Sequence, residues 1–244
     1  MLRALKAWLT GRASTGDAQW ASVQSWCAQR ELVYEAAAAG GGFAVRGRVA
    51  TTAWRLAWGP PQRLYVRGRG ELLLQSEMNL APELHLMLLD RGLHRQLERA
   101  VLDQIQGAAD GLVDARMPAE MRWVATFPRL DPAQAGLPEG LAAVASHPEW
   151  ILAWTGAALG QALRRAPVPG HAPWVLTVGA GELNLRAALD DPHPAQLEAW
   201  IGLFECAMRE ARRAQVEMGD KGEPTTLPSL WAVGRDDGPE GERS

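Results

Sequence analysis

The sequence predicts an α+β protein in which antiparallel sheets are each covered by helices. Side chains between residues 43 and 69 alternate between apolar and polar, which is typical of strands with one face on a core and the other in water. Apolar residues in 82–106 and 195–216 instead recur with the 3.6-residue period of an amphipathic helix. Because this strand-then-helix pattern occurs twice, we expect two similar strand-helix lobes.

An internal repeat would explain the two lobes. A shift of 111 residues aligns residues 68–100 with residues 179–211, so that two glycines, one glutamate and two leucines coincide. Apolar helix positions further along, from Leu86 and Leu197 onward, also coincide. Repetition is the first feature to look for in a new sequence. Duplication and independent use of the same strand-helix unit both stay open as explanations.

These patterns divide the 244 residues into four parts. Residues 1–16 are expected to form a short helix and a loop, 17–118 a first lobe with a basic sheet, and 119–218 a second lobe. Residues 219–244 are acidic and rich in Pro and Gly, so we expect a disordered tail. Leu227–Val233 is an apolar island in that tail; it is either a short docking motif or a segment that folds back onto the body.

Four further segments complete the expected elements of the second lobe. The aromatic and β-branched run 121–127 indicates a strand, and 141–146 indicates a short helix. A longer helix is expected over 148–165. Residues 174–178 and 182–189 alternate like strands, and the glycines between them indicate a hairpin turn.

The clearest charge signal lies in the first lobe. Between Ala36 and Gly70 the chain has no Asp or Glu but six Arg. Neighbouring side chains of a strand point to opposite faces, so these arginines lie opposite apolar residues such as Val45 and Leu56. The wet face, and with it the expected partner-binding site, consists of Arg46, Arg48, Arg55, Arg67, Arg69 and Tyr65.

Two interpretations of this basic face are open. The arginines either keep a sheet in solution and pair with Glu35, Glu71 or Glu77, or they form a docking surface for an acidic partner. Arginine suits the second role because its planar guanidinium meets carboxylates bidentately. The whole chain has a formal net charge of −3, so the residues outside this window sum to −9. A basic face on an acidic protein favours oriented contact over general polyanion binding.

The motifs of common enzymes and cofactor sites are absent from the sequence. There is no GxxxxGK[ST], HExxH or GxSxG, and the glycines at 179–181 lack the third glycine and the helix of a dinucleotide site. The five histidines do not share one helix face, so we expect no metal site. We therefore name no catalytic residue and expect no cofactor.

Composition bears on compartment and source. The two cysteines, Cys27 and Cys206, are far apart and outside any CxxC, so we expect reduced thiols. No apolar run approaches the length of a membrane span. We expect a cytoplasmic protein. The chain has 23 Arg and only two Lys, which is typical of a GC-rich bacterial genome.

Three classes of function follow in order. The first is a non-enzymatic protein-binding or assembly module, similar to an adaptor or chaperone, whose arginine-rich sheet face meets an acidic protein surface. The second is an enzyme of unrecognised type, because catalytic residues scattered along a single sequence leave no pattern. The third is a nucleic-acid-binding sheet, which needs aromatic side chains on the wet face; only Tyr65 is expected there.

Overall fold

The computed structural model describes most of the chain. It covers residues 19–37, 41–107, 117–166 and 172–220. The helix and loop expected at 1–16 lie outside these residues, as does the expected tail from residue 221 on, with Leu227–Val233. The first two residues of that expected tail, Gly219 and Asp220, instead end the last helix.

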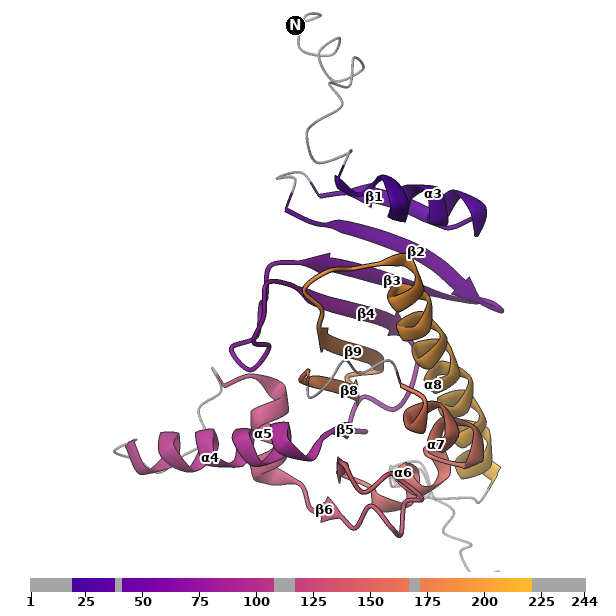
Figure 1. Ribbon diagram of the computed structural model, residues 1–244. Helices are drawn as coiled ribbons and strands as arrows, with labels where there is room; N and C mark the ends of the chain where they lie inside the picture. Colours follow the sequence, from indigo (N-terminus) through magenta and orange to yellow (C-terminus); the bar gives the residue numbers. More distant parts are fainter. Residues whose placement is uncertain (1–18, 38–40, 108–116, 167–171, 221–244) are drawn as a thin grey trace, which may run out of the picture.

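The described strands form one continuous antiparallel sheet, which confirms the α+β prediction (Figure 1). The strands are β1 (Val33–Ala36), β2 (Phe43–Val49), β3 (Thr52–Gly59), β4 (Glu71–Glu77), β5 (Leu86–Asp90), β6 (Arg129–Leu130), β7 (Leu141–Ala145), β8 (Trp174–Gly179) and β9 (Glu182–Ala188). Their order across the sheet is β1-β2-β3-β4-β9-β8-β5-β7-β6. Because β4 pairs with β9, the two expected lobes share one sheet instead of having one each.

One face of the sheet, the packed face, is apolar throughout. Register places Val45, Leu56, Leu74, Leu185 and Leu176 side by side on neighbouring strands, and all are buried. Four helices pack their apolar stripes against this face: α3 (Ala21–Gln29), α6 (Pro148–Trp154), α7 (Ala157–Arg164) and α8 (Pro194–Asp220). Helix α8 runs beside the sheet toward α6 and α7 (Figure 1). This side of the sheet therefore holds the main hydrophobic core.

The second face is covered over part of its area. Helices α4 (Arg91–Gly107) and α5 (Ala119–Thr126) pack with Met87, Leu89, Val144 and Val175 in a smaller apolar cluster. These residues belong to β5, β7 and β8. We call the second-face side chains of β1, β2, β3 and β4, together with Glu182 and Asn184 of β9, the open half, because they lie outside this apolar cluster of α4 and α5. Arg186 of β9 instead pairs with Glu120 of α5, and Ala188 belongs to the cluster.

Two short elements differ from the sequence prediction. Of residues 121–127, expected as a strand, 121–126 lie in α5, which follows Pro118, has Glu120 in its first turn and ends before Phe127. Residues 141–146, expected as a helix, contain β7, which is buried on both faces. A short apolar run without alternation fits either element by periodicity alone. In both places the neighbouring structure decided between them.

Two of the three long predicted helices are shorter than expected, whereas the third, expected over 195–216, is longer. The helix expected from residue 82 begins at Arg91, because Leu86–Asp90 form the central strand β5. Asp90 ends the strand and caps the helix, since its Oδ1 accepts a hydrogen bond from Leu93 N at 3.0 Å. The helix expected over 148–165 is broken between Trp154 and Ala157 into α6 and α7.

The internal repeat is not confirmed. Its strands, β4 and β9, are direct neighbours, and Leu74 pairs with Leu185, the two positions that the shift of 111 residues aligns. The helices do not correspond, because Leu86 lies in strand β5 whereas its counterpart Leu197 lies in α8. A repeat would also place the two helices on the same side of the sheet, but α4 packs on the second face and α8 on the packed face, so that expectation is wrong.

The buried histidine of α4 makes stability depend on pH. His94 is 2% exposed, and its Nδ1 lies 3.4 Å from Glu98 Oε2. Burial lowers the pKa of His94, while Glu98 raises it and Arg129 lowers it, with a net shift downward. A group whose pKa is lower in the folded state stabilises the fold above its unfolded pKa of ~6.5, and this stabilisation is lost as the pH falls below that value.

We expect His94→Gln to flatten the acid side of the stability profile. Below pH ~6.5 the free energy of unfolding of the wild type should fall by up to about 1.4 kcal/mol per pH unit more than that of the variant. Urea denaturation between pH 5 and pH 8 measures this difference. His193→Gln is the control, because His193 is exposed; an unchanged slope in His94→Gln would contradict the prediction.

Candidate functional site

The open half of the sheet is polar. Arg46, Arg55, Gln75 and Asn184 are cross-strand neighbours and form one row over β2, β3, β4 and β9. The row continues to Thr177 of β8, which is buried. Gln75 Nε2 donates to Asn184 Oδ1 at 3.0 Å. Polar side chains suit these positions because water meets them where no described helix packs.

Three of the predicted arginines stand together on this half. Arg46, Arg48 and Arg55 are exposed on β2 and β3, as the alternation predicts. Arg46 Nη2 pairs with Glu35 Oε2 at 3.0 Å, and Arg48 Nη2 donates to Thr51 O at 3.2 Å.

Arg55 lies directly opposite Arg46 and forms no ion pair with any described residue. Like charges directly opposite each other in a sheet are destabilising. Arg55 therefore carries a positive charge that no described carboxylate pairs with directly.

Acidic residues lie beside these arginines. Glu77 and Glu182 are directly opposite each other on β4 and β9, and Glu77 is exposed. Arg55 and Gln75 occupy the neighbouring row on β3 and β4. The open half therefore has a basic end over β2 and β3 and an acidic end over β4 and β9.

Arg67 and Arg69 do not extend the basic end of the sheet. They lie in the loop 60–70, which joins the end of β3 to the start of β4. Arg69 N donates to Asp190 Oδ1 at 2.5 Å, beyond the end of β9. Arg67 lines a hollow of about 650 Å³ together with Asp190 and Asp191. Both side chains are exposed, but they stand beside acidic residues at the other end of the strands.

The expectation that Tyr65 lies on the wet face is wrong. Residues 64–69 are not a strand, and Tyr65 is 5% exposed whereas Leu64 is 100% exposed. The loop folds back because Glu71 Oε2 accepts hydrogen bonds from Gln62 N at 2.6 Å and Arg63 N at 3.2 Å. The hydroxyl of Tyr65 donates to Glu120 Oε1 at 2.9 Å. Burial, and next to it Glu120, raises the pKa of Tyr65 far above its ordinary value.

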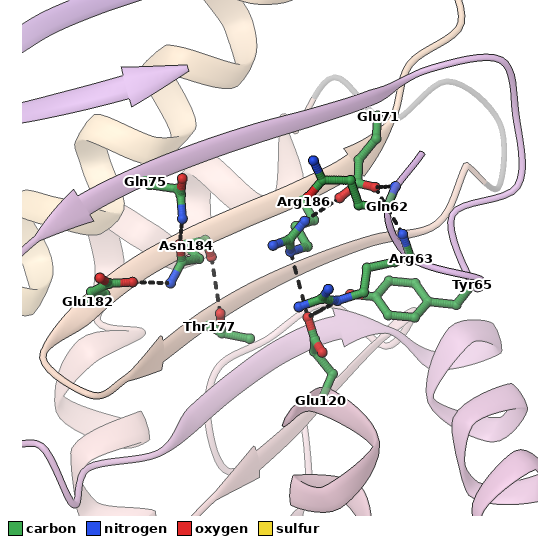
Figure 2. Close-up of polar contacts among 10 residues, drawn as sticks. All are labelled: Gln62, Arg63, Tyr65, Glu71, Gln75, Glu120, Thr177, Glu182, Asn184 and Arg186. Carbon is green, nitrogen blue, oxygen red and sulfur yellow. Dashed lines mark hydrogen bonds and ion pairs between the residues drawn. The ribbon is translucent and has the colours of Figure 1, made fainter. Parts of the chain in front are cut away.

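A charged cluster lies beneath this loop (Figure 2). Arg186 Nη1 lies 2.5 Å from Glu71 Oε1, and Arg186 Nε lies 3.7 Å from Glu120 Oε1. Arg63 Nε donates to the same Glu120 oxygen at 3.3 Å. The side chains of Glu71, Glu120 and Arg186 are 3%, 6% and 12% exposed. We call Arg63, Glu71, Glu120 and Arg186 the buried charge cluster; its two positive and two negative charges balance.

No motif in the sequence indicated the whole of this cluster. Glu120 lies 57 residues from Arg63 along the chain, and its helix was expected to be a strand. Glu71 was one of the carboxylates expected to pair with the arginines, but nothing in the sequence indicated that Glu120 and Arg186 lie beside it.

A cleft of about 340 Å³ adjoins the cluster. It lies where α5 stands over β8 and β9, and Arg63, Glu120, Arg122 and Arg186 line it. Among the described residues, no group of three or more His, Cys, Asp or Glu side chains is arranged to hold a metal ion.

The fold and these surfaces define an α+β protein with one large antiparallel sheet, one half of whose second face is open and charged. No described helix is both long and apolar enough for a membrane span. No protein-family model matches the sequence, and no curated protein matches it.

Among solved structures, the chain is similar to the crystal structure of the mycobacterial trehalose monomycolate transport factor A, TtfA. The TM-score is 0.45 at 10% identity, over 82% of this chain and 96% of that chain. A likeness of this degree concerns the path of the chain and carries no functional argument.

Proposed function

We propose that this protein is a non-enzymatic binding or assembly module, and that the basic end of its open sheet half meets an acidic protein surface. The contact residues are Arg46, Arg48 and Arg55, with Arg67 and Arg69 as a separate point of contact at the loop. One observation carries the proposal: Arg55 is exposed, lies directly opposite Arg46 and has no ion pair with a described carboxylate. An acidic partner relieves that repulsion.

The charge pattern favours a protein partner over a nucleic acid. A phosphate backbone requires positive charge along its whole path, but Glu77 and Glu182 lie close to Arg55 on the same face. An RNA-reading sheet also uses exposed aromatic side chains for stacking, and Tyr65 is buried against Glu120. An oriented protein surface with its own acidic and basic parts suits such a divided face. The cytoplasm, where we expected the protein from its sequence, remains the proposed location.

Charge reversal tests the proposal. Arg48→Glu with Arg55→Glu leaves the Arg46–Glu35 pair in place, and Arg95→Glu with Arg99→Glu on α4 is the matched control, because both residues are exposed. Exposed ion pairs contribute up to about 1 kcal/mol each, so we expect affinity for an acidic partner to fall roughly tenfold or more in the first variant.

The measurement is capture from the native host, followed by titration of the recovered protein at low and high salt. We expect an acidic protein that wild type and the α4 control retain, that the Arg48/Arg55 variant loses, and whose binding weakens with salt. Equal recovery by all three proteins would refute the proposed contact. Recovery of RNA or DNA by wild type would favour the nucleic-acid alternative instead.

A further inference from the structure

The cleft beside α5 has the size and the preformed walls of a small-molecule site. Its volume of about 340 Å³ is near the lower end of the range for ligand pockets, roughly 300–1,000 Å³. One wall is aromatic. The rings of His85 and Trp123 meet edge to face with centroids 5.0 Å apart, and Phe127 stacks on the other side of His85 at 5.4 Å.

The aromatic wall is held in place from below. Trp123 lies so close to Gly179 that a Cβ added there would be 2.5 Å from its ring. His85 Nδ1 lies 2.7 Å from Glu83 O, which fixes the imidazole. The cleft therefore keeps its shape without a ligand, which lowers the entropic cost of binding.

Glu120, one of the residues that line this cleft, has an unused acceptor. The residue is 5% exposed, and its Oε1 accepts hydrogen bonds from the Tyr65 hydroxyl and from Arg63 Nε. Its second oxygen, Oε2, is buried and has no hydrogen-bond partner in the described part of the chain. A buried polar atom without a partner is unfavourable, and native proteins rarely leave one unless a ligand or water satisfies it.

Arg122 has an unused hydrogen-bond donor and an unpaired charge. Its Nε is buried without a partner, and it forms no ion pair with any described residue. The carboxylates of the buried charge cluster are paired with Arg63 and Arg186, and Glu182, which also lines the cleft, accepts a hydrogen bond from the Asn184 amide at 3.5 Å. The Arg122 guanidinium therefore lines the cleft without an ion pair to any described carboxylate. The guanidinium group is suited to bind a carboxylate through two parallel hydrogen bonds.

We propose that this cleft binds a small carboxylic acid that also carries a hydroxyl or amine group, such as an α-hydroxy or α-amino acid. Arg122 binds the carboxylate, and Glu120 Oε2 accepts the hydrogen bond from the hydroxyl or amine. The floor of Thr177, Asn184 and Arg186 offers further polar groups. The residues proposed to bind here differ from those of the protein-binding face: Glu120 and Arg122 belong to α5, whereas Arg46, Arg48 and Arg55 lie on β2 and β3. The two sites adjoin, because Gln75, which lines the cleft, lies directly opposite Arg55.

Ligand-observed NMR and calorimetric titration of the full chain test the site with defined probes. L-lactate and L-serine carry both groups, propionate lacks the hydrogen-bond donor, and inorganic phosphate lacks the carboxylate. For ligands of this size we expect a dissociation constant on the order of 1 mM. Propionate should bind at least tenfold more weakly than L-lactate, because it leaves Glu120 Oε2 unpaired.

Two variants distinguish specific binding in the cleft from a general effect of the protein's positive charge. Arg122→Gln, outside the buried charge cluster, should weaken binding of L-lactate or L-serine at least tenfold, and Arg95→Gln on α4 should leave it unchanged. Gly179→Ala displaces the Trp123 ring and should also weaken binding.

Absence of saturable binding of both acids to wild type, or equal binding by wild type and Arg122→Gln, overturns the proposal. Equal binding of propionate and L-lactate overturns the role of Glu120. If inorganic phosphate alone binds and depends on Arg122, the cleft is a phosphate site and the assignment to a carboxylic acid is wrong.

Discussion

Replacing Arg186 with methionine is expected to lower the free energy of unfolding by about 3–5 kcal/mol. Arg186 stands between Glu71 and Glu120, whose side chains are 3% and 6% exposed. Without the guanidinium, Glu71 keeps only its two backbone donors, and Glu120 keeps Arg63 and Tyr65. Two carboxylates then remain buried with too little positive charge between them, and removing one partner of a buried ion pair costs far more than the pair itself contributes.

Urea denaturation of the wild type and of Arg186→Met measures this loss. The control is Arg30→Gln, which removes the ion pair with Glu198. Those two side chains are 55% and 48% exposed, so the control should change stability by at most about 1 kcal/mol. Adding Glu71→Gln to Arg186→Met should cost less than the sum of the single changes, because it removes one of the stranded charges. Equal, small losses in Arg186→Met and Arg30→Gln would contradict the account of the cluster.

Trp154→Ala is expected to lower the free energy of unfolding by a similar amount, about 3–5 kcal/mol. Trp154 lies on α6, is completely buried on the packed face, and donates from Nε1 to Ala207 O of α8 at 3.0 Å. Truncation removes the indole contacts between α6 and α8 and leaves a cavity. It also leaves the Ala207 carbonyl oxygen without this donor, which adds to the cost.

Trp150, one helical turn earlier, provides the matched control. It is only partly buried against the same core, so Trp150→Ala should cost clearly less than Trp154→Ala. Trp154→Phe should keep most of the packing and lose mainly the hydrogen bond to Ala207, at roughly 0.5–1.5 kcal/mol plus the lost ring volume. Thermal and urea denaturation of the three variants test this order. A loss in Trp154→Ala no larger than that in Trp150→Ala would show that α6 is not held by its buried tryptophan.

The two proposed binding sites differ in how far their mutation also changes the stability of the fold. Arg48 and Arg55 are exposed, so their reversal should leave the fold intact. Glu120 belongs to both the cleft and the buried charge cluster, so its replacement would change binding and stability together. For this reason Arg122 is the residue at which binding by the cleft can be measured separately.

The sequence by itself determined the local features. In β2 and β3, strict alternation put Val45 and Leu56 on one face and Arg46 and Arg55 on the other, because successive side chains of a strand point to opposite sides. The α+β class followed from the same change of period between strands and helices. The apolar stripe of the last helix was also evident, since a helix that covers a sheet needs one apolar face.

Tertiary structure decided everything that depends on contacts between distant segments. Strands β5 and β7 are buried on both faces, so their sequences do not alternate and resemble short helices. The pairing of β4 with β9 merged two expected lobes into one sheet. Tyr65 was expected on the solvent-facing side, but it is buried, and its hydroxyl donates a hydrogen bond to Glu120 of α5. Alternation describes only the geometry of one segment. Whether that segment is buried depends on which other segment packs against it, and this is determined by residues far away in the sequence.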